Sequence, residues 1–267
     1  SYCGVISLFR VAFRRESSIE HPRASILLGN LNSFIWSFVS MSTFFVTGTD
    51  TDVGKTFVAC ALLAAANQRG LTTAAVKPVA AGCEATPEGL RNDDALALQE
   101  AMSLPLSYEQ INPITLEPAI APHIAAARAG KNITVDRLVG FCRGVMMQRA
   151  DFTLIEGAGG WRVPLNGRET LAELPKALNI PVILVVGMRL GCINHALLSA
   201  EAIHRDGLQI AGWVANRTEA EMSCYDENLA SLKARLPFLC LGEIPNLPGA
   251  AAAEVAIHLD IDKLIDP

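Results

Sequence analysis

The sequence predicts a three-layer α/β fold, in which helices flank a mainly parallel central sheet. Short apolar runs of β type alternate with helical segments from residue 43 to about residue 245. Such alternation is typical of right-handed β-α-β crossovers. The chain has 267 residues, of which 51% are hydrophobic, so it can bury one large core. We therefore expect a single domain over residues 42–262.

The expected elements follow from their apolar patterns. Run 181–186 is the strongest strand, because no polar residue lies between Pro181 and Gly187. Segment 136–148 is an amphipathic helix, with apolar side chains at helical spacing on one side. The expected strands are 44–46, 73–76, 152–155, 181–186 and 210–215, with a terminal run at 239–245, and the expected helices are 57–67, 93–102, 136–148, 194–205 and 223–235.

Charge and cysteine content limit the possible partners. The net charge of −5 argues against a nucleic acid or an anionic membrane as the main partner. Seven cysteines are scattered without a C-x-x-C pair, so neither a zinc site nor a disulfide framework is expected. Reduced thiols indicate a cytoplasmic protein.

Residues 1–41 do not show the alternation of predicted strands and helices that the rest of the chain shows. Arginines follow a mildly apolar start, and the later apolar residues are interrupted by asparagines and serines. Neither a signal peptide nor a spanning helix has this pattern. Because Met41 lies two residues before the first expected strand, we expect native translation to begin there, and we assign residues 1–41 to a leader whose part upstream of Met41 is not native or is disordered. An organelle-targeting arm is the alternative.

The stretch from Gly48 to Thr56 predicts a phosphate-binding loop. It follows an apolar strand and opens a helix, where backbone N–H groups and the helix dipole favour anions. Gly54 permits close backbone approach, Lys55 supplies a cation, and the Thr56 hydroxyl can bind Mg²⁺. Gly48 and Gly54 enclose five residues, one more than the usual motif, so this is a variant P-loop. We therefore expect a P-loop NTPase-like fold.

Other strands also end in polar residues. Lys77, Glu156 and Asn216 each follow a predicted strand, and ligands of parallel sheets gather at the carboxyl ends of the strands. An acid after a buried strand facing a P-loop is the usual second Mg²⁺ anchor, which makes Glu156 the candidate. Pro78 fixes an extended exit that would hold the Lys77 ammonium over the sheet. A solvated strand end is the alternative for Lys77 and for Glu156.

Seven short segments follow in order along the chain: TGTDT (47–51), VGKT (53–56), KPV (77–79), TPEGLRN (86–92), EGAGGW (156–161), GCINH (191–195) and GWVAN (212–216). Taken together, these segments resemble the dethiobiotin synthetase family over residues 42–247. The resemblance implies a homodimeric, single-domain P-loop enzyme of biotin synthesis. Such an enzyme closes a cyclic urea on 7,8-diaminononanoate with CO₂, ATP and Mg²⁺, through a carbamate and a carbamic-phosphoric anhydride.

The resemblance also implies a role for individual residues. Lys77 and Lys55 would be catalytic, and Thr56, Asp94 and Glu156 would hold Mg²⁺. The nucleotide would contact Asp52, Val53, Gly54, Lys55, Thr56, Phe57, Asp94, Glu156, Gly157, Ala158, Gly159, Asn216, Arg217, Pro245, Asn246 and Leu247. The diamine substrate would contact Thr51, Lys77 and Ala81, and across the dimer interface Leu190, Gly191, Cys192, Ile193 and Asn194.

The chain departs from the family pattern at two positions. Ala81 stands where a substrate-contacting serine is common, so that hydroxyl contact is absent or supplied elsewhere. Asp52 stands where glutamate is frequent, which we expect to be tolerated. Asp93 and Asp94 compete for the metal role, and the spacing to Asn92 favours Asp94.

Two other functions remain as alternatives. A ParA/MinD-type ATPase would carry a further lysine early in the loop, where this chain has Thr49 to Thr51. It would usually also carry a basic patch or a membrane helix. An amide ligase of the cobyrinic acid a,c-diamide synthase type needs a glutaminase domain, for which we expect no room in this chain.

Overall fold

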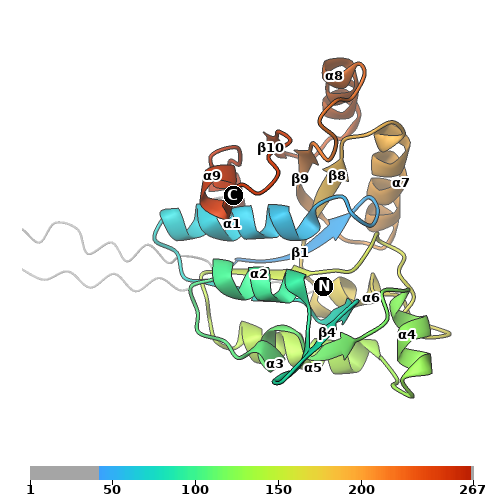
Figure 1. Ribbon diagram of the computed structural model, residues 1–267. Helices are drawn as coiled ribbons and strands as arrows, with labels where there is room; N and C mark the ends of the chain where they lie inside the picture. The colour runs from blue at the N-terminus through green and yellow to red at the C-terminus, as the bar shows by residue number, and fades with distance from the viewer. Residues whose placement is uncertain (1–41, 266–267) are drawn as a thin grey trace, which may run out of the picture. The chain divides into compact units, whose positions relative to one another are not determined.

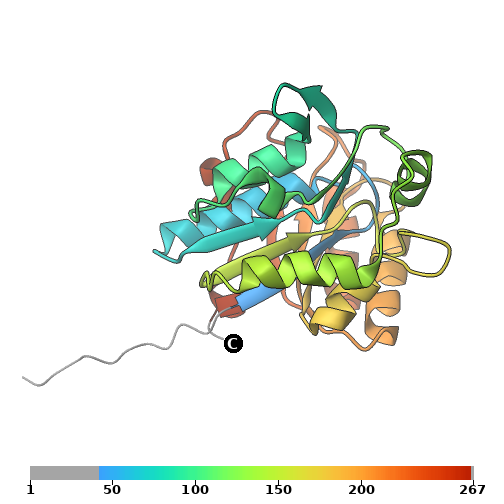
Figure 2. The ribbon, with the colours of Figure 1, turned by 90° about the horizontal axis from the view of Figure 1, so that it is seen from below.

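The computed structural model describes residues 42–265, so the expected leader, residues 1–41, lies outside the described part. Six parallel strands form the central sheet in the order β10-β9-β8-β1-β7-β2. Helices cover both faces, with α1 on one side of the sheet and α5 on the other (Figures 1 and 2). The predicted three-layer fold with a mainly parallel sheet is confirmed.

Every expected strand and helix is present. The sheet strands are β1 (Ser42–Gly48), β2 (Thr73–Val76), β7 (Phe152–Glu156), β8 (Val182–Gly187), β9 (Ile210–Asn216) and β10 (Cys240–Ile244). The expected helices are α1 (Lys55–Gln68), α2 (Asp93–Ala101), α5 (Val135–Met146), α7 (Cys192–Arg205) and α8 (Tyr225–Arg235). Both β7 and β8 are buried along their whole length, as expected for strands covered on both faces.

The elements that sequence patterns missed are short. They are the strands β3 (Val79–Ala81), β4 (Glu84–Thr86), β5 (Gly89–Arg91) and β6 (Ile114–Leu116), and the helices α3 (Tyr108–Ile111), α4 (Pro122–Arg128), α6 (Glu173–Leu178), α9 (Ala252–Ala256) and α10 (Asp262–Ile265). Three residues are too few to show a period. Moreover, β3 pairs in parallel with the distant β6, which no local pattern can predict.

The chain leaves the central sheet at the carboxyl end of β2. Directly after Lys77 and Pro78 it enters β3, and β4 and β5 then form an antiparallel hairpin before α2 begins. The start of α2 is capped by Asn92, whose side chain accepts a hydrogen bond from the backbone of Ala95. This segment, residues 77–92, brings the start of α2 to the edge of the sheet where the strands end. Within residues 42–265, no helix is long and apolar enough to cross a membrane.

Candidate active site

Gly54 sets the shape of the P-loop. It caps the N-terminus of α1 with φ of 81°, a left-handed conformation that glycine adopts without strain. A Cβ atom at this position would lie 2.2 Å from Nδ2 of Asn216. Glycine is therefore required here for both backbone conformation and space.

Val53 anchors the loop to the sheet. Its side chain is buried, and a Cβ atom on Gly48 or Gly187 would come within 3 Å of it. Its carbonyl accepts a hydrogen bond from Asn216 Nδ2 at 2.9 Å. The side chain of Val53 thus packs beneath the loop, and only its backbone is available to a nucleotide.

Lys55 lies at the start of α1 and lines the central pocket. Its ammonium donates a hydrogen bond to the carbonyl of Asp50 at 3.1 Å, within the same loop. Burial, and then the nearby charge of Lys77, lowers the pKa of Lys55. An incoming anion would relieve both effects.

Lys77 forms a buried ion-pair cluster with the acids at the neighbouring element ends. Its Nζ donates to Asp94 Oδ2 at 2.7 Å and to Glu156 Oε1 at 2.5 Å, and it is only 4% exposed. Thr56 Oγ1 donates to the same oxygen of Glu156 at 2.8 Å. The cluster joins α1, α2 and the ends of β2 and β7. The alternative of a solvated strand end is therefore wrong for both Lys77 and Glu156.

The pKa values of Lys77 and Asp94 shift in opposite directions. Burial alone would lower the pKa of Lys77, but the charges of Glu156 and Asp94 outweigh it and raise the pKa. Burial likewise opposes ionisation of Asp94, yet the Lys77 ammonium and the Thr56 hydroxyl hold its pKa below the usual range. The lysine and Asp94 therefore both remain charged at neutral pH.

The donor set fits Mg²⁺. Glu156 Oε2 is buried and, among the described residues, has no hydrogen-bond partner, which leaves an acceptor for a cation. Asp94 lines the pocket, whereas Asp93 is exposed and does not line it. Two carboxylates and one hydroxyl suit an ion that retains waters and binds phosphate oxygens. The site has only two carboxylates, and within the described residues no cluster of three or more His, Cys, Asp or Glu side chains could hold a metal by itself.

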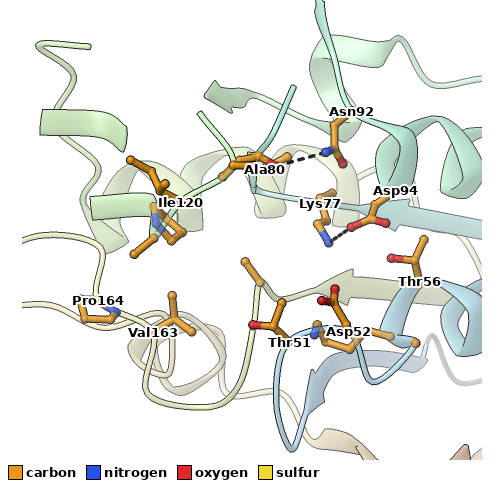
Figure 3. A pocket seen from close by; sticks show the side chains of 18 of the residues that line it. Thr51, Asp52, Thr56, Lys77, Ala80, Asn92, Asp94, Ile120, Val163 and Pro164 are labelled. Atoms are coloured by element: carbon orange, nitrogen blue, oxygen red, sulfur yellow. Dashed lines mark hydrogen bonds and ion pairs between the residues drawn. The ribbon is translucent and has the colours of Figure 1, made fainter. Parts of the chain in front are cut away.

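A pocket of about 900 Å³ opens between the P-loop and the segment that follows β2, residues 77–92. Figure 3 shows Lys77, Asp94 and Thr56 at one end and Ile120, Val163 and Pro164 at the other. The pocket is thus polar where the charges converge and apolar at its far end. Its predicted lining residues are Thr51, Asp52, Gly54, Lys55, Thr56, Phe57, Lys77, Ala81, Asp94, Ala158 and Gly159.

The apolar end was missed by sequence reasoning. Ala119 to Pro122 lies in a run of alanines and prolines that shows no period, and Val163 and Pro164 follow the glycine-rich loop. Their apolar character just beyond a recognised motif was the only available signal. The further unpredicted lining residues are Ala80, Asn92 and Arg162.

The residues expected around the adenine gather outside this pocket, at the ends of β9 and β10. Arg217 N donates to the carbonyl of Ile244 at 2.9 Å, and Asn246 Nδ2 donates to the carbonyl of Arg217 at 3.3 Å. Asn216 connects this group to the P-loop through its bond to Val53. The group of Asn216, Arg217, Pro245, Asn246 and Leu247 thus adjoins the P-loop without lining the pocket.

Segment 190–194 does not line the pocket of its own chain. It begins α7, with Gly191 at the N-cap and with Leu190 93% exposed. Cys192 is buried, and burial raises the pKa of its thiol, so it is a packed thiol. Gly157 also lies outside the pocket, packed closely against Phe45.

Comparisons with known proteins agree on the family. A model described as an AAA domain matches residues 42–254. The chain is 60% identical over 228 residues to the ATP-dependent dethiobiotin synthetase BioD of Cellvibrio japonicus, covering 85% of this chain and 100% of the relative. It is 61% identical to the BioD of Pseudomonas paraeruginosa and 58% identical to that of Marinobacter nauticus, in each case covering 84% of this chain and 98% of the relative.

Solved structures share the fold at low identity. A chain of the MinC:MinD cell division protein complex of Aquifex aeolicus matches with a TM-score of 0.53 and 14% identity, over 84% of this chain and 93% of that chain. A ParA family ATPase from Chlorobium tepidum matches with a TM-score of 0.50 and 13% identity, over 82% of this chain and 100% of that chain. These matches identify a P-loop NTPase fold and nothing beyond the fold.

Proposed function

The chain belongs to the dethiobiotin synthetase family, and we propose that its pocket closes the ureido ring of dethiobiotin on 7,8-diaminononanoate with CO₂ and ATP. It is an ATP-dependent ligase of biotin biosynthesis. The observation that carries the finer proposal is the position of Lys77. Its ammonium lies between Asp94 and Glu156, at the polar end of a pocket that Lys55 also lines.

Ring closure would proceed in three balanced steps. One amine of the substrate adds to CO₂ and loses a proton, which gives a carbamate. A carbamate oxygen then attacks the γ-phosphorus of ATP, the bond to ADP breaks, and a carbamic-phosphoric anhydride forms. The second amine attacks the anhydride carbonyl, the bond to phosphate breaks, and phosphate leaves as the amine loses a proton.

The two lysines would stabilise the charge that develops in these steps. Negative charge gathers on the carbamate and phosphoryl oxygens, and fixed cations aimed at such oxygens are a large source of rate enhancement. Lys55 would leave the carbonyl of Asp50 to bind the phosphates. Lys77, held at the end of β2, would bind the carbamate and the transferred phosphoryl group.

Thr56, Asp94 and Glu156 would hold Mg²⁺, and the free Oε2 of Glu156 supports that assignment. When bound, the ion would neutralise phosphate charge and orient the oxygens of ATP. Thr56 and Glu156 are already joined by a hydrogen bond, so the P-loop helix and the end of β7 keep a fixed separation.

The pocket also offers an apolar surface for the alkyl chain of the diamine. Its apolar end, formed by Ile120, Val163 and Pro164, would pack along the alkyl chain. At the start of α7, the backbone N–H groups of Ile193 and Asn194 would donate hydrogen bonds to the substrate carboxylate in a second copy of the chain. We therefore propose a cytoplasmic homodimer with shared sites, in which the group around Asn216 and Pro245 binds the adenine.

Product formation tests the proposal directly. ATP hydrolysis should require the diamine together with bicarbonate, and mass spectrometry should detect dethiobiotin in proportion to ADP. Glutamine, DNA and lipid vesicles, added in turn, should not stimulate turnover. Stimulation by glutamine would favour an amide ligase, whereas stimulation by DNA or lipid would favour a partitioning ATPase.

A further inference from the structure

A buried chain of hydrogen bonds runs behind the lysine cluster. Tyr108, the first residue of α3, accepts a hydrogen bond at Oη from the backbone N–H of Asn92 at 2.7 Å. The same hydroxyl donates to Oδ1 of Asn112 at 3.0 Å, and Nδ2 of Asn112 donates to the carbonyl of Lys77 at 2.7 Å. Tyr108, Asn92 and Asn112 are all buried. Each link is therefore shielded from water, which makes its loss costly.

The two ends of this chain are the backbones that carry the site charges. At one end, Asn92 caps α2, and Asp94 lies in the first turn of that helix. At the other end, Lys77 is held twice, because its N–H also donates to the carbonyl of Ile111 at 2.8 Å. Tyr108 thus links the main chain at Lys77 to the start of the helix that presents Asp94.

Neither Tyr108 nor Asn112 lines the pocket, so neither is placed to touch a substrate. In the mechanism proposed above, the Lys77 ammonium changes partners from carboxylates to carbamate and phosphoryl oxygens. The direct ion pair with Asp94 cannot then fix the separation of the two elements. The hydrogen bonds through Tyr108 do not involve the ammonium and can persist throughout.

We propose that Tyr108 is a positioning residue, whose hydroxyl holds the Lys77 backbone and the start of α2 at the separation that ring closure requires. The inference rests on the proposed function of Lys77. It concerns the hydroxyl alone, because the ring is held separately. The guanidinium of Arg91 stacks over it at 4.1 Å from the centroid.

The test uses Tyr108→Phe with Thr73→Val as the matched control. Phenylalanine keeps the ring and loses both hydroxyl bonds. Thr73 is a fully buried residue at the opposite end of β2, whose hydroxyl donates to Asn67 Oδ1 at 2.8 Å and accepts from the Ser103 backbone at 2.9 Å. Valine at 73 removes a comparable number of buried hydrogen bonds without touching the site.

Tyr108→Phe should lower kcat for dethiobiotin formation about tenfold, while the KM for ATP changes less than about twofold. Thr73→Val should lower the melting temperature and leave kcat within about threefold of the parent. A fall in kcat of less than about threefold in Tyr108→Phe overturns the proposal, and so does an equal fall in Thr73→Val.

A second variant tests whether the links form one chain. Asn112→Ala should show the same fall in kcat. The kcat of the double variant, Tyr108→Phe with Asn112→Ala, should be no lower than that of the less active single variant, since one broken link already frees Lys77. Independent, multiplying losses overturn the proposal. Lys77→Gln distinguishes failure of the positioning role from failure of the proposed function. If Lys77→Gln forms dethiobiotin at the normal rate, the catalytic role of Lys77 is refuted. If Lys77→Gln loses most of its activity while Tyr108→Phe stays fully active, only the positioning role of Tyr108 is refuted.

Discussion

The ammonium of Lys77 lies 2.5 Å from Oε1 of Glu156, although 79 positions separate the two residues in the sequence. The contact follows from strand order. β2 and β7 are neighbours, with Val76 opposite Ile155, so the next residue on each strand emerges at the same point of the sheet edge. Both side chains are buried there, and each partly offsets the cost of burying the other's charge.

Removing the charge of Glu156 should impair both catalysis and stability. Glu156→Gln keeps the shape but leaves Lys77 with only Asp94 as a carboxylate partner. We expect the free energy of unfolding to fall by about 1–3 kcal/mol and turnover to fall by about 10² or more. Chemical denaturation and dethiobiotin formation measure the two effects. The control is Glu201→Gln, because that exposed pair with Arg205 is worth less than about 0.5 kcal/mol. Unchanged turnover in Glu156→Gln would remove this residue from the site.

The two lysines should be separable by nucleotide affinity. Lys77→Gln should lower turnover by about 10² to 10³, the effect of losing one donor to developing charge. Its affinity for ATP should weaken much less than that of Lys55→Gln, because Lys55 and the loop N–H groups remain. Isothermal titration with ATP beside product assays makes the comparison. If Lys77→Gln loses affinity as severely as Lys55→Gln while bound complexes turn over normally, Lys77 is only a nucleotide ligand.

The ionised carboxylate of Asp94 should stabilise the folded state at neutral pH, and this stabilisation should be lost in acid. The folded pKa of this carboxyl is depressed below the unfolded value of about 3.9. Its contribution is therefore complete above that value and is lost as the pH falls through the folded pKa. The difference in unfolding free energy between the parent and Asp94→Asn should shrink as the pH falls below about 4. Denaturation at a series of pH values gives this difference, and a constant gap would contradict the assignment.

Gly54→Ala should abolish tight ATP binding. Alanine would be strained at φ of 81°, and its Cβ would meet Asn216 Nδ2, so the loop must move away from Asn216 and lose the hydrogen bond between Asn216 and Val53. Gly70→Ala is the matched control, since Gly70 has φ of 78° but open space around its Cβ position. That control should lose about 1–2 kcal/mol of stability and keep its affinity for ATP. Equal ATP affinity in both variants would show that the space beside Asn216 is unimportant.

Deleting residues 1–40 should leave activity and thermal stability unchanged. The family match begins at residue 42, and so does the first strand that the structure describes. Thermal unfolding and dethiobiotin formation of a chain that begins at Met41 test this. An insoluble or inactive product would show that the segment contributes to the fold.

Local pattern was sufficient for the strands of the central sheet, for the five long helices and for much of the site. Strand 181–186 and the helix after the P-loop were recognisable because each has an apolar pattern within one short window. Residues at strand ends, such as Lys77 and Glu156, could be marked as site candidates because parallel strands end at one edge of a sheet. Their roles came from the resemblance between motifs.

Tertiary structure decided what those candidates touch. The sequence shows that Lys77 and Glu156 each end a strand, but the order of strands, and hence their contact, depends on packing between distant segments. The apolar end of the pocket around Ile120 and the hydrogen bonds of Tyr108 depend on short elements whose partners lie far along the chain. Such contacts have no sequence period, because they are fixed by the folding of the whole domain rather than by the conformation of any one segment.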